Sequence, residues 1–287
     1  MQEFTNKVAV VTGGASGIGK ARAAKCLEEG MQVVLADVEE DALARTTEEF
    51  QAGGVNSVLP VVTNVARKAE IEALAKKAVD EFGGVHLLFN NAGVGAGTNP
   101  QDTTYDDWEW VIGVNLWSVI YGVKTFLPIM QAQEGECHIV NTASVAGLVY
   151  GSGSSPYSVT KHGVVALTEG IYFDQSVKGT NTGASVLCPG FTATNIADSA
   201  RNRPGDLPDE TVVALTPEIE AGREMFQNMI DNGMPPAELA EIVFDGIRAK
   251  RLYIVTVPDF NEIIQQRTNQ ITSGTNPEWG PFPFQDE

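Results

Sequence analysis

The stretch KVAVVTGGASGIG, residues 7–19, decides the fold. Its valine-rich run, residues 7–12, is typical of a parallel strand buried on both faces. Glycines spaced as Gly-x3-Gly-x-Gly follow it, and residues 18–29 have a helical pattern. A strand, a glycine turn and a helix N-terminus form a pyrophosphate site, because free backbone N–H groups and the positive helix end point at the anion. Glycine-rich turns also serve close packing, so the strand-to-helix setting is what favours phosphate binding.

A carboxylate follows the second predicted strand, residues 32–36, at Asp37. This position lies about twenty residues past the glycine turn, where a dinucleotide-binding unit places an acid on the adenosine ribose hydroxyls. Asp37 would repel a 2′-phosphate, and neither Ser16 nor Val38 offers a positive charge to receive one. We therefore predict NAD as the cofactor rather than NADP. The alternative interpretation is an exposed carboxylate at a strand end.

Strands and helices alternate along the rest of the chain. Further strands are predicted at residues 57–62, 86–89, 137–142, 184–187 and 252–257, and helices at 39–51, 67–82, 105–131, 156–178 and 236–250. The alternation predicts one α/β domain over residues 1–287, a Rossmann-type doubly wound parallel sheet of seven strands in three α/β/α layers. Small-residue turns at 90–93 and 188–190 follow two of the strands. They lie at the edge where open α/β sheets bind ligands.

Two segments fall outside the alternation. Residues 191–235 contain only two helical stretches, 195–201 and 217–232, and we expect this insertion to cover the substrate. Residues 259–287 form a C-terminal extension, whose last part from residue 276 has aromatic residues and prolines without periodicity. That tail covers a neighbouring subunit, covers the pocket, or is a loose end.

Composition excludes some classes of protein. The net charge is −18, and the 19 Lys and Arg residues are spread along the chain, so a nucleic-acid partner is not expected. The three cysteines are widely spaced, which favours reduced, buried thiols over a metal site or disulfides. No leader-like segment or apolar stretch of about 18 residues is visible, so we expect a cytoplasmic enzyme without membrane attachment.

A Tyr-x3-Lys pair lies at the start of the predicted helix 156–178. Positions i and i+4 share a helix face, so the ammonium of Lys161 lies beside the phenol of Tyr157. A free tyrosine has a pKa of about 10, and a nearby positive charge favours the phenolate. We therefore predict that Tyr157 exchanges a proton with a substrate hydroxyl or carbonyl. For the pair alone, a half-buried Tyr beside a solvated Lys is the alternative.

Together these residues resemble the short-chain dehydrogenases/reductases of the main, single-domain branch. The pieces that carry the resemblance are Thr12-Gly13-x3-Gly17-x-Gly19, Asp37, Asn90-Asn91-Ala92-Gly93, Asn115, Ser144, Tyr157-x3-Lys161 and Pro189-Gly190 with Thr194. They span residues 12–194 in the order of that family. One departure is Asn64-Val65, where the family often has Asp and an apolar residue that contact the adenine amino group. An amide oxygen still accepts that hydrogen bond.

The resemblance implies roles for the site residues. Tyr157 would be the general acid/base, and Lys161 would lower its pKa and bind the nicotinamide ribose. Ser144 would polarise the substrate oxygen, and Asn115 would hold a water beside Lys161 in a proton relay. The residues implied for the cofactor are Gly13, Ser16, Gly17, Ile18, Gly19, Asp37, Asn64, Val65, Asn91, Ala92, Gly93, Tyr157, Lys161, Pro189, Gly190, Thr192 and Thr194.

The expected function is NAD-dependent hydride transfer between nicotinamide and a secondary alcohol or ketone, without a metal. We expect a hydrophobic or aromatic small molecule, aryl-propane or steroid-like, bound at Ser144, Val145, Tyr157 and Phe191. A catalytically silent NAD(H) sensor or scaffold is the alternative, and NAD-dependent epimerisation or dehydration is a third possibility. The resemblance also implies a homodimer or homotetramer that packs helices 105–131 and 156–178 against their symmetry mates.

Overall fold

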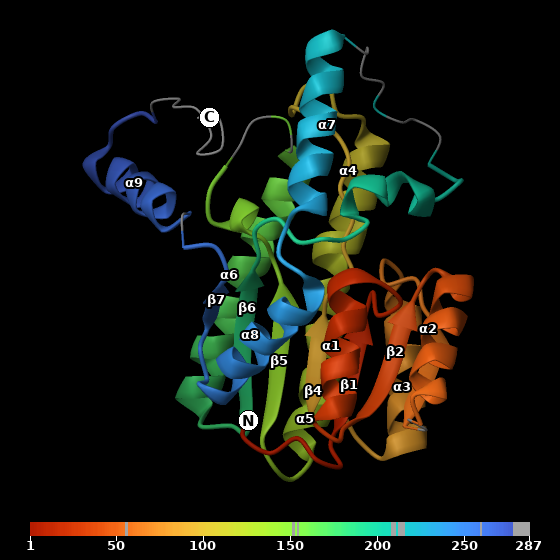
Figure 1. Ribbon diagram of the computed structural model, residues 1–287. Helices are drawn as coiled ribbons and strands as arrows, with labels where there is room; N and C mark the ends of the chain where they lie inside the picture. The colour runs from red at the N-terminus through yellow and green to blue at the C-terminus, as the bar shows by residue number, and fades with distance from the viewer. Residues whose placement is uncertain are drawn as a thin grey trace.

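The computed structural model describes residues 1–54, 57–150, 153, 155–207, 211, 216–258 and 260–277. Seven parallel strands form one sheet in the order β3-β2-β1-β4-β5-β6-β7 (Figure 1). The strands are β1 (Val8–Thr12), β2 (Gln32–Asp37), β3 (Val58–Val62), β4 (Leu87–Asn90), β5 (Cys137–Thr142), β6 (Thr182–Cys188) and β7 (Tyr253–Val255). The predicted fold class is therefore confirmed.

Helices cover both faces of this sheet. One face carries α1 (Gly17–Glu28), α2 (Glu40–Ala52) and α8 (Pro236–Arg248), and the other carries α3 (Lys68–Phe82), α5 (Ser118–Ala132) and α6 (Ser155–Lys178). Alternate side chains of one strand serve the two layers: Ala9 and Val11 pack with α1 and α8, whereas Val8 and Val10 pack with α3 and α5. Burial on both faces explains the continuous apolar run that marks β1 in the sequence.

The strand order reverses at β1. From β1 the chain winds outward to β2 and β3, and it then returns past β1 to β4 and winds the other way. The loops after β1 and β4 consequently leave the sheet in opposite directions. Open α/β sheets bind ligands in the crevice that this divergence creates beyond the carboxyl ends of the strands.

The predicted helix 105–131 consists of three pieces. These are α4 (Tyr105–Ile112), a π-helical turn η1 (Gly113–Trp117) and α5. Together, Tyr105–Ala132 are long and apolar enough to cross a membrane by length and composition alone. The apolar side chains of α5 pack on the sheet with α3 and α6, and this packing accounts for its composition. Single π turns inside helices are frequent at functional sites.

The insertion, as far as it is described, lies beyond the carboxyl ends of the strands. Its 3₁₀ segment η3 (Ile196–Asn202) replaces the first predicted helical stretch, and α7 (Pro217–Asp231) projects away from the sheet (Figure 1). A short β-bridge between Thr192 and Met234 ties its two ends together. Residues 208–210 and 212–215 of the insertion lie outside the described residues.

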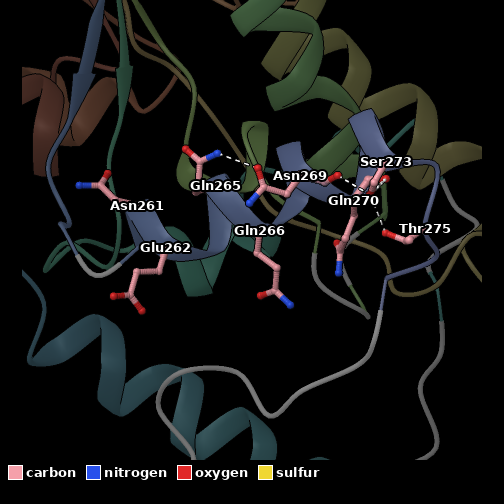
Figure 2. Close-up of a pocket in the computed structure, with 8 residues that line it drawn as sticks. All are labelled: Asn261, Glu262, Gln265, Gln266, Asn269, Gln270, Ser273 and Thr275. Atoms are coloured by element: carbon pink, nitrogen blue, oxygen red, sulfur yellow. Dashed lines mark hydrogen bonds between the residues drawn. The ribbon is translucent and has the colours of Figure 1, made fainter.

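The C-terminal extension contains α9 (Phe260–Ser273), a helix that the sequence pattern did not indicate. It packs through Phe260 and otherwise extends away from the body of the protein. Figure 2 shows a shallow hollow on its outer face, lined by polar side chains such as Gln265, Gln266 and Asn269. No predicted site residue lines this hollow. The aromatic residues of the tail, at positions 279, 282 and 284, lie outside the described residues.

All three cysteines, Cys26, Cys137 and Cys188, are free and buried, as the sequence predicts.

Candidate active site

The glycine turn between β1 and α1 has a shape that side chains would fill. Gly13 and Gly17 have positive φ angles of 63° and 51°, which favour glycine. A β-carbon at Gly19 would overlap the carbonyl oxygen of Gly13, and one at Gly13 would lie 2.9 Å from the Cα of Ala92. Ser16 is the N-cap of α1, and its side chain makes no capping hydrogen bond, so the first N–H groups of the helix are left for a ligand. The turn therefore fits a pyrophosphate.

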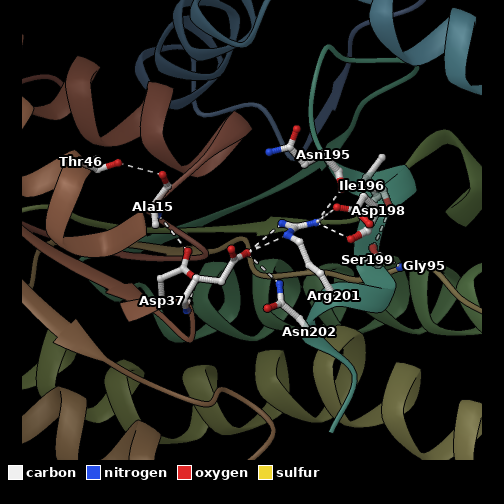
Figure 3. A network of polar contacts seen from close by, with 11 residues as sticks. Ala15, Asp37, Thr46, Gly95, Asn195, Ile196, Asp198, Ser199, Arg201 and Asn202 are labelled. Carbon is white, nitrogen blue, oxygen red and sulfur yellow. Dashed lines mark hydrogen bonds and ion pairs between the residues drawn. The ribbon is translucent and has the colours of Figure 1, made fainter. Parts of the chain in front are cut away.

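Asp37 ends β2 beside this turn (Figure 3). Its Oδ2 accepts a hydrogen bond of 2.9 Å from the backbone N–H of Ala15, and its Oδ1 accepts one of 3.1 Å from that of Glu39. Burial raises the pKa of the Asp37 carboxyl, and these two hydrogen bonds oppose the rise. The predicted ribose-binding acid thus lies where the glycine turn and the loop after β2 meet.

The turn after β4 is joined to the glycine turn. The Nδ2 of Asn91 donates a 3.0 Å hydrogen bond to the carbonyl of Thr12, and the backbone N–H of Asn91 donates one of 2.9 Å to the Oγ1 of Thr12. Gly93 lies next, and a β-carbon there would be 3.5 Å from both the Oδ1 of Asn115 and the Nζ of Lys161. This turn therefore brings the residues predicted to bind phosphate close to the predicted catalytic residues.

Asn115 occupies the π turn η1 and is 1% exposed. Its Oδ1 accepts from the backbone N–H of Val94 and its Nδ2 donates to the carbonyl of Val94, both at 2.8 Å. The amide therefore fixes the loop after β4 against the helix. Both ends of the side chain are occupied by backbone, and the water that Asn115 is predicted to hold stays a prediction.

Ser144 and Tyr157 face each other across the end of β5. Ser144 follows the strand in extended conformation, and its Oγ accepts a hydrogen bond of 3.2 Å from the backbone N–H of Ala146. Burial raises the pKa of the Tyr157 phenol, while a hydrogen bond from Ser144 opposes the rise. The shift is opposite to the lowering that the sequence predicts from Lys161, because a helix pattern does not reveal how deeply the phenol lies.

Lys161 lies one turn after Tyr157 in α6. Its Nζ is 5.3 Å from the centre of the Tyr157 ring and donates a 3.0 Å hydrogen bond to the carbonyl of Thr142. Burial lowers the pKa of Lys161 to about 8. The predicted proximity of the two side chains is present, with the ammonium held by the backbone of β5.

The remaining predicted residues lie around the same crevice. The carbonyl of Pro189 accepts a 3.0 Å hydrogen bond from the N–H of Val145, which joins the loops after β5 and β6. A β-carbon at Gly17 would be 3.0 Å from the Cγ2 of Thr194, so the insertion begins directly over the glycine turn. The ring of Phe191 packs edge-on against Phe226 of α7 at 6.1 Å. The other residues predicted here are Ile18, Val65 and Thr192, all partly or fully buried, and Gly190, which packs against Val257.

Asn64 has contacts that the sequence did not indicate. Its N–H donates to Glu70 at 2.6 Å, and its Oδ1 accepts from the N–H of Ala66 at 3.0 Å. That oxygen has a second lone pair, and its hydrogen bond to an adenine amino group stays a prediction.

Sequence reasoning missed a buried cation behind the site. Arg22 of α1 is fully buried, and its Nη1 donates hydrogen bonds to the Oγ1 of Thr142 at 2.8 Å and the Oδ1 of Asn91 at 3.2 Å. A signal for it exists: Arg22 lies four positions from both Ile18 and Cys26, on the face of the helix that the apolar pattern turns toward the sheet.

The family model for short chain dehydrogenases matches residues 7–205. A solved structure, a short chain dehydrogenase/reductase from Burkholderia phymatum in complex with NAD, has 43% identity and a TM-score of 0.93, and the match covers 98% of this chain and all of that chain. Among curated relatives, a CLA biosynthesis dehydrogenase/reductase from Lactiplantibacillus plantarum is 32% identical over 97% of both chains. A C alpha-dehydrogenase from a Sphingobium species is 33% identical over 96% of this chain and 89% of its own length.

These similarities extend over the whole crevice, from the glycine turn to the segment that begins over it at Thr194, and they support binding of NAD(H) there. With Ser144, Tyr157 and Lys161 gathered at the end of β5, the chain belongs to the short-chain dehydrogenase/reductase family and is an oxidoreductase of the class that acts on CH–OH groups.

Proposed function

We propose that this protein interconverts a secondary alcohol and the corresponding ketone, with NAD preferred over NADP and with a hydrophobic or aromatic substrate. The observation that carries the proposal is the arrangement of Ser144, Tyr157 and Lys161 within one crevice that also contains the glycine turn and Asp37. A catalytically silent NAD(H) sensor would not need this acid/base group at the end of β5.

The glycine turn would hold the pyrophosphate, Asp37 the adenosine ribose, and Lys161 the nicotinamide ribose. A bound nicotinamide supplies a hydride acceptor or donor. Tyr157 handles the proton: its phenolate accepts the alcohol proton in oxidation, and its phenol donates a proton to the ketone oxygen in reduction. The hydroxyl of Ser144 orients the substrate oxygen beside it. Because burial favours the neutral phenol, the ligand-free site is ready for reduction, and oxidation requires loss of the Tyr157 proton first.

The substrate would lie between the loop after β5 and the insertion. Val145 on one side and the Phe191–Phe226 pair on the other offer apolar and aromatic surface. The Sphingobium relative is named for dehydrogenation at an alpha carbon, which is consistent with oxidation of a carbinol next to a larger group. Aryl-propane and steroid-like alcohols both satisfy this chemistry.

The preference for NAD rests on Asp37. Its carboxylate lies at the end of β2 beside the glycine turn, where the 2′-phosphate of NADP would meet a negative charge. The ribose hydroxyls of NAD would instead donate hydrogen bonds to it.

An oligomer is also proposed. On α6, and on the π turn η1 that leads into α5, large apolar side chains remain exposed, among them Trp117 (47%), Phe173 (61%) and Val177 (87%). These surfaces would be covered in a homodimer or homotetramer that packs the two helices against their symmetry mates. Sedimentation that finds only a monomer at working concentrations would contradict this part of the proposal.

The test of the reaction is nicotinamide absorbance. Purified protein is mixed with NAD, and separately with NADP, and challenged with aliphatic, aryl-propane, steroid and sugar alcohols, followed by the corresponding ketones with NADH. Turnover confined to apolar secondary alcohols or their ketones, and faster with NAD, supports the proposal. Tight NADH binding without turnover of any alcohol or ketone would favour the silent module.

A further inference from the structure

The segment η3 crosses from one side of the cofactor crevice to the other. At its middle the Oγ of Ser199, 3% exposed, accepts a 3.0 Å hydrogen bond from the N–H of Gly95, in the loop after β4. At its C-terminal end Arg201 and Asn202 reach the loop that follows Asp37 (Figure 3). The substrate-covering insertion is therefore attached to the predicted adenosine side of the site.

One carboxylate oxygen of Glu39 accepts the hydrogen bonds from both residues. Its Oε1 accepts hydrogen bonds from the Nε and Nη2 of Arg201, at 3.1 and 2.8 Å, and from the Nδ2 of Asn202 at 2.8 Å. The backbone N–H of Glu39 in turn donates to Asp37. The hydrogen bonds from Asn202 and Arg201 lower the pKa of Glu39, so its carboxylate is charged at neutral pH.

Arg201 is held in place from its other side as well. Its Nη1 donates to the carbonyls of Asn195 at 3.0 Å and Asp198 at 2.5 Å. The guanidinium is thus fixed one side chain away from Asp37. Arg45 of α2 adds a second positive charge near Glu39.

The ion pair between Arg201 and Glu39 is expected to add little to the stability of the fold. The side chains of Arg201 and Glu39 are 30% and 31% exposed, and ion pairs with such exposure contribute little to folding. A guanidinium beside the adenosine ribose has a stronger chemical consequence, because it is the side chain best suited to bind a phosphate through two parallel hydrogen bonds.

We propose that Glu39 is a second cofactor-selecting residue, which occupies Arg201 and so withholds from NADP the guanidinium that would bind its 2′-phosphate. Asp37 repels the phosphate, and Glu39 removes the cation that would attract it. This inference rests on the proposed function, because it assigns the adenosine ribose to the end of β2.

The experiment measures binding rather than turnover. Dissociation constants for NADH and NADPH are obtained from nicotinamide fluorescence for the wild type, Asp37→Ser, Asp37→Ser/Glu39→Gln and Asp37→Ser/Glu39→Gln/Arg201→Gln. Glutamine keeps the size of Glu39 and can still accept a hydrogen bond, so the fold is retained. Adding Glu39→Gln to Asp37→Ser should tighten NADPH binding about tenfold and change NADH binding less than about threefold. Adding Arg201→Gln should cancel that gain.

A matched control is Glu29→Gln. Glu29 accepts a 2.5 Å hydrogen bond from Arg248, and the side chains of this pair are about as exposed as those of Glu39 and Arg201. The Glu29–Arg248 pair joins the end of α1 to α8, so Glu29→Gln should leave the ratio of the NADH and NADPH dissociation constants unchanged. The gain from Glu39→Gln should also shrink as ionic strength rises.

Two results would overturn the inference. In one, Glu39→Gln weakens or tightens NADH and NADPH binding equally, which is the behaviour of a structural clamp. In the other, the NADPH gain survives the loss of Arg201. If the wild type binds NADH tightly, either of these results leaves the proposed function intact. A wild type that binds neither NADH nor NADPH would instead contradict the proposed function itself.

Discussion

The Nη1 of Arg22 lies 2.8 Å from the Oγ1 of Thr142, inside the protein and behind the predicted catalytic residues. Thr142 also accepts the hydrogen bond from Lys161 through its carbonyl, so one residue of β5 contacts two buried cations. Arg22 is fully buried and its guanidinium lies over the ring of Phe89. Among the residues that the structure describes, its Nε and Nη2 have no hydrogen-bond partner. Burial lowers its pKa to about 9. A buried cation in this setting destabilises the fold, so its contribution is to hold Thr142 and Asn91 in place.

Replacing Arg22 should therefore separate stability from activity. Arg22→Met removes the buried charge at similar volume, and we expect the free energy of unfolding to stay equal or rise by about 1–4 kcal/mol. Turnover should fall, because Thr142 and Asn91 lose a common partner. Urea unfolding and kcat/KM measure the two effects. Lys20→Met, on the same helix but with a partly exposed side chain that pairs with Glu49, is the control and should change neither. Lower stability together with unchanged kcat/KM would show that Arg22 serves the fold instead.

Lys161 should destabilise the ligand-free protein over a defined pH range. Its pKa falls from 10.5 to about 8 on folding, so below pH 8 the folded protein must bury a charged ammonium. Between pH 8 and 10.5 the unfolded chain binds more protons at Lys161 than the folded protein does. The free energy of unfolding therefore rises with pH over this range. Lys161→Met should raise the free energy of unfolding at pH 7 by on the order of 3 kcal/mol, and abolish turnover.

The advantage of Lys161→Met should shrink when urea unfolding is repeated near pH 10. The difference between wild type and variant isolates this group from others that titrate in the same range. Lys178→Met, at the exposed end of the same helix, should show no such pH-dependent difference. An advantage that is constant from pH 7 to pH 10 would contradict the assigned shift.

Local patterns were sufficient for the sheet and for the positions of the glycine turn and of the Tyr157–Lys161 pair in it. The apolar run of β1, the glycines after it and the Tyr-x3-Lys pair are each determined by neighbours within a few positions, and each lies where the pattern predicts. β6 and β7 differ from their predicted ranges by a few residues at their ends, because pairing with the neighbouring strand decides where a strand ends, and β7 pairs with β6 over Tyr253–Val255.

Contacts between distant segments could not be read in this way. Arg201 and Glu39 are 162 positions apart, and each alone resembles a solvated charge on a polar segment. The raised pKa of Tyr157 depends on how α6 packs at the end of β5, which the spacing of Tyr157 and Lys161 does not contain. The helix α9 was missed because its sequence is dominated by polar residues, with Phe260 as its buried residue.

The glycine turn gives a steric prediction. In Gly19→Ala the new β-carbon would overlap the carbonyl of Gly13, so the turn must open. We expect NADH binding to be lost and the melting temperature to fall. Gly222→Ala is the matched control, because Gly222 is exposed in α7, outside the helices proposed to pack in the oligomer, with no atom within 4 Å of its β-carbon position. That control should stabilise the protein by about 0.5–1 kcal/mol. NADH titration and thermal melts of both variants test the turn, and normal NADH affinity in Gly19→Ala would reject it as the pyrophosphate site.

Tyr157→Phe tests the chemistry with the smallest change. The ring remains, so packing in α6 and the NADH dissociation constant should change little, while the group that exchanges the proton is lost. General acid/base catalysis contributes about 10²–10⁴-fold, and kcat should fall by that factor in both directions. The wild type should oxidise alcohols faster as pH rises, because burial keeps Tyr157 protonated, and should reduce ketones faster as pH falls. The variant should lose both dependences together with turnover. Tyr172→Phe makes the same substitution four turns further along α6, outside the crevice, and should retain wild-type kinetics. A Tyr157→Phe enzyme with full turnover and an unchanged pH profile would show that another group exchanges the proton, and would contradict the proposed mechanism.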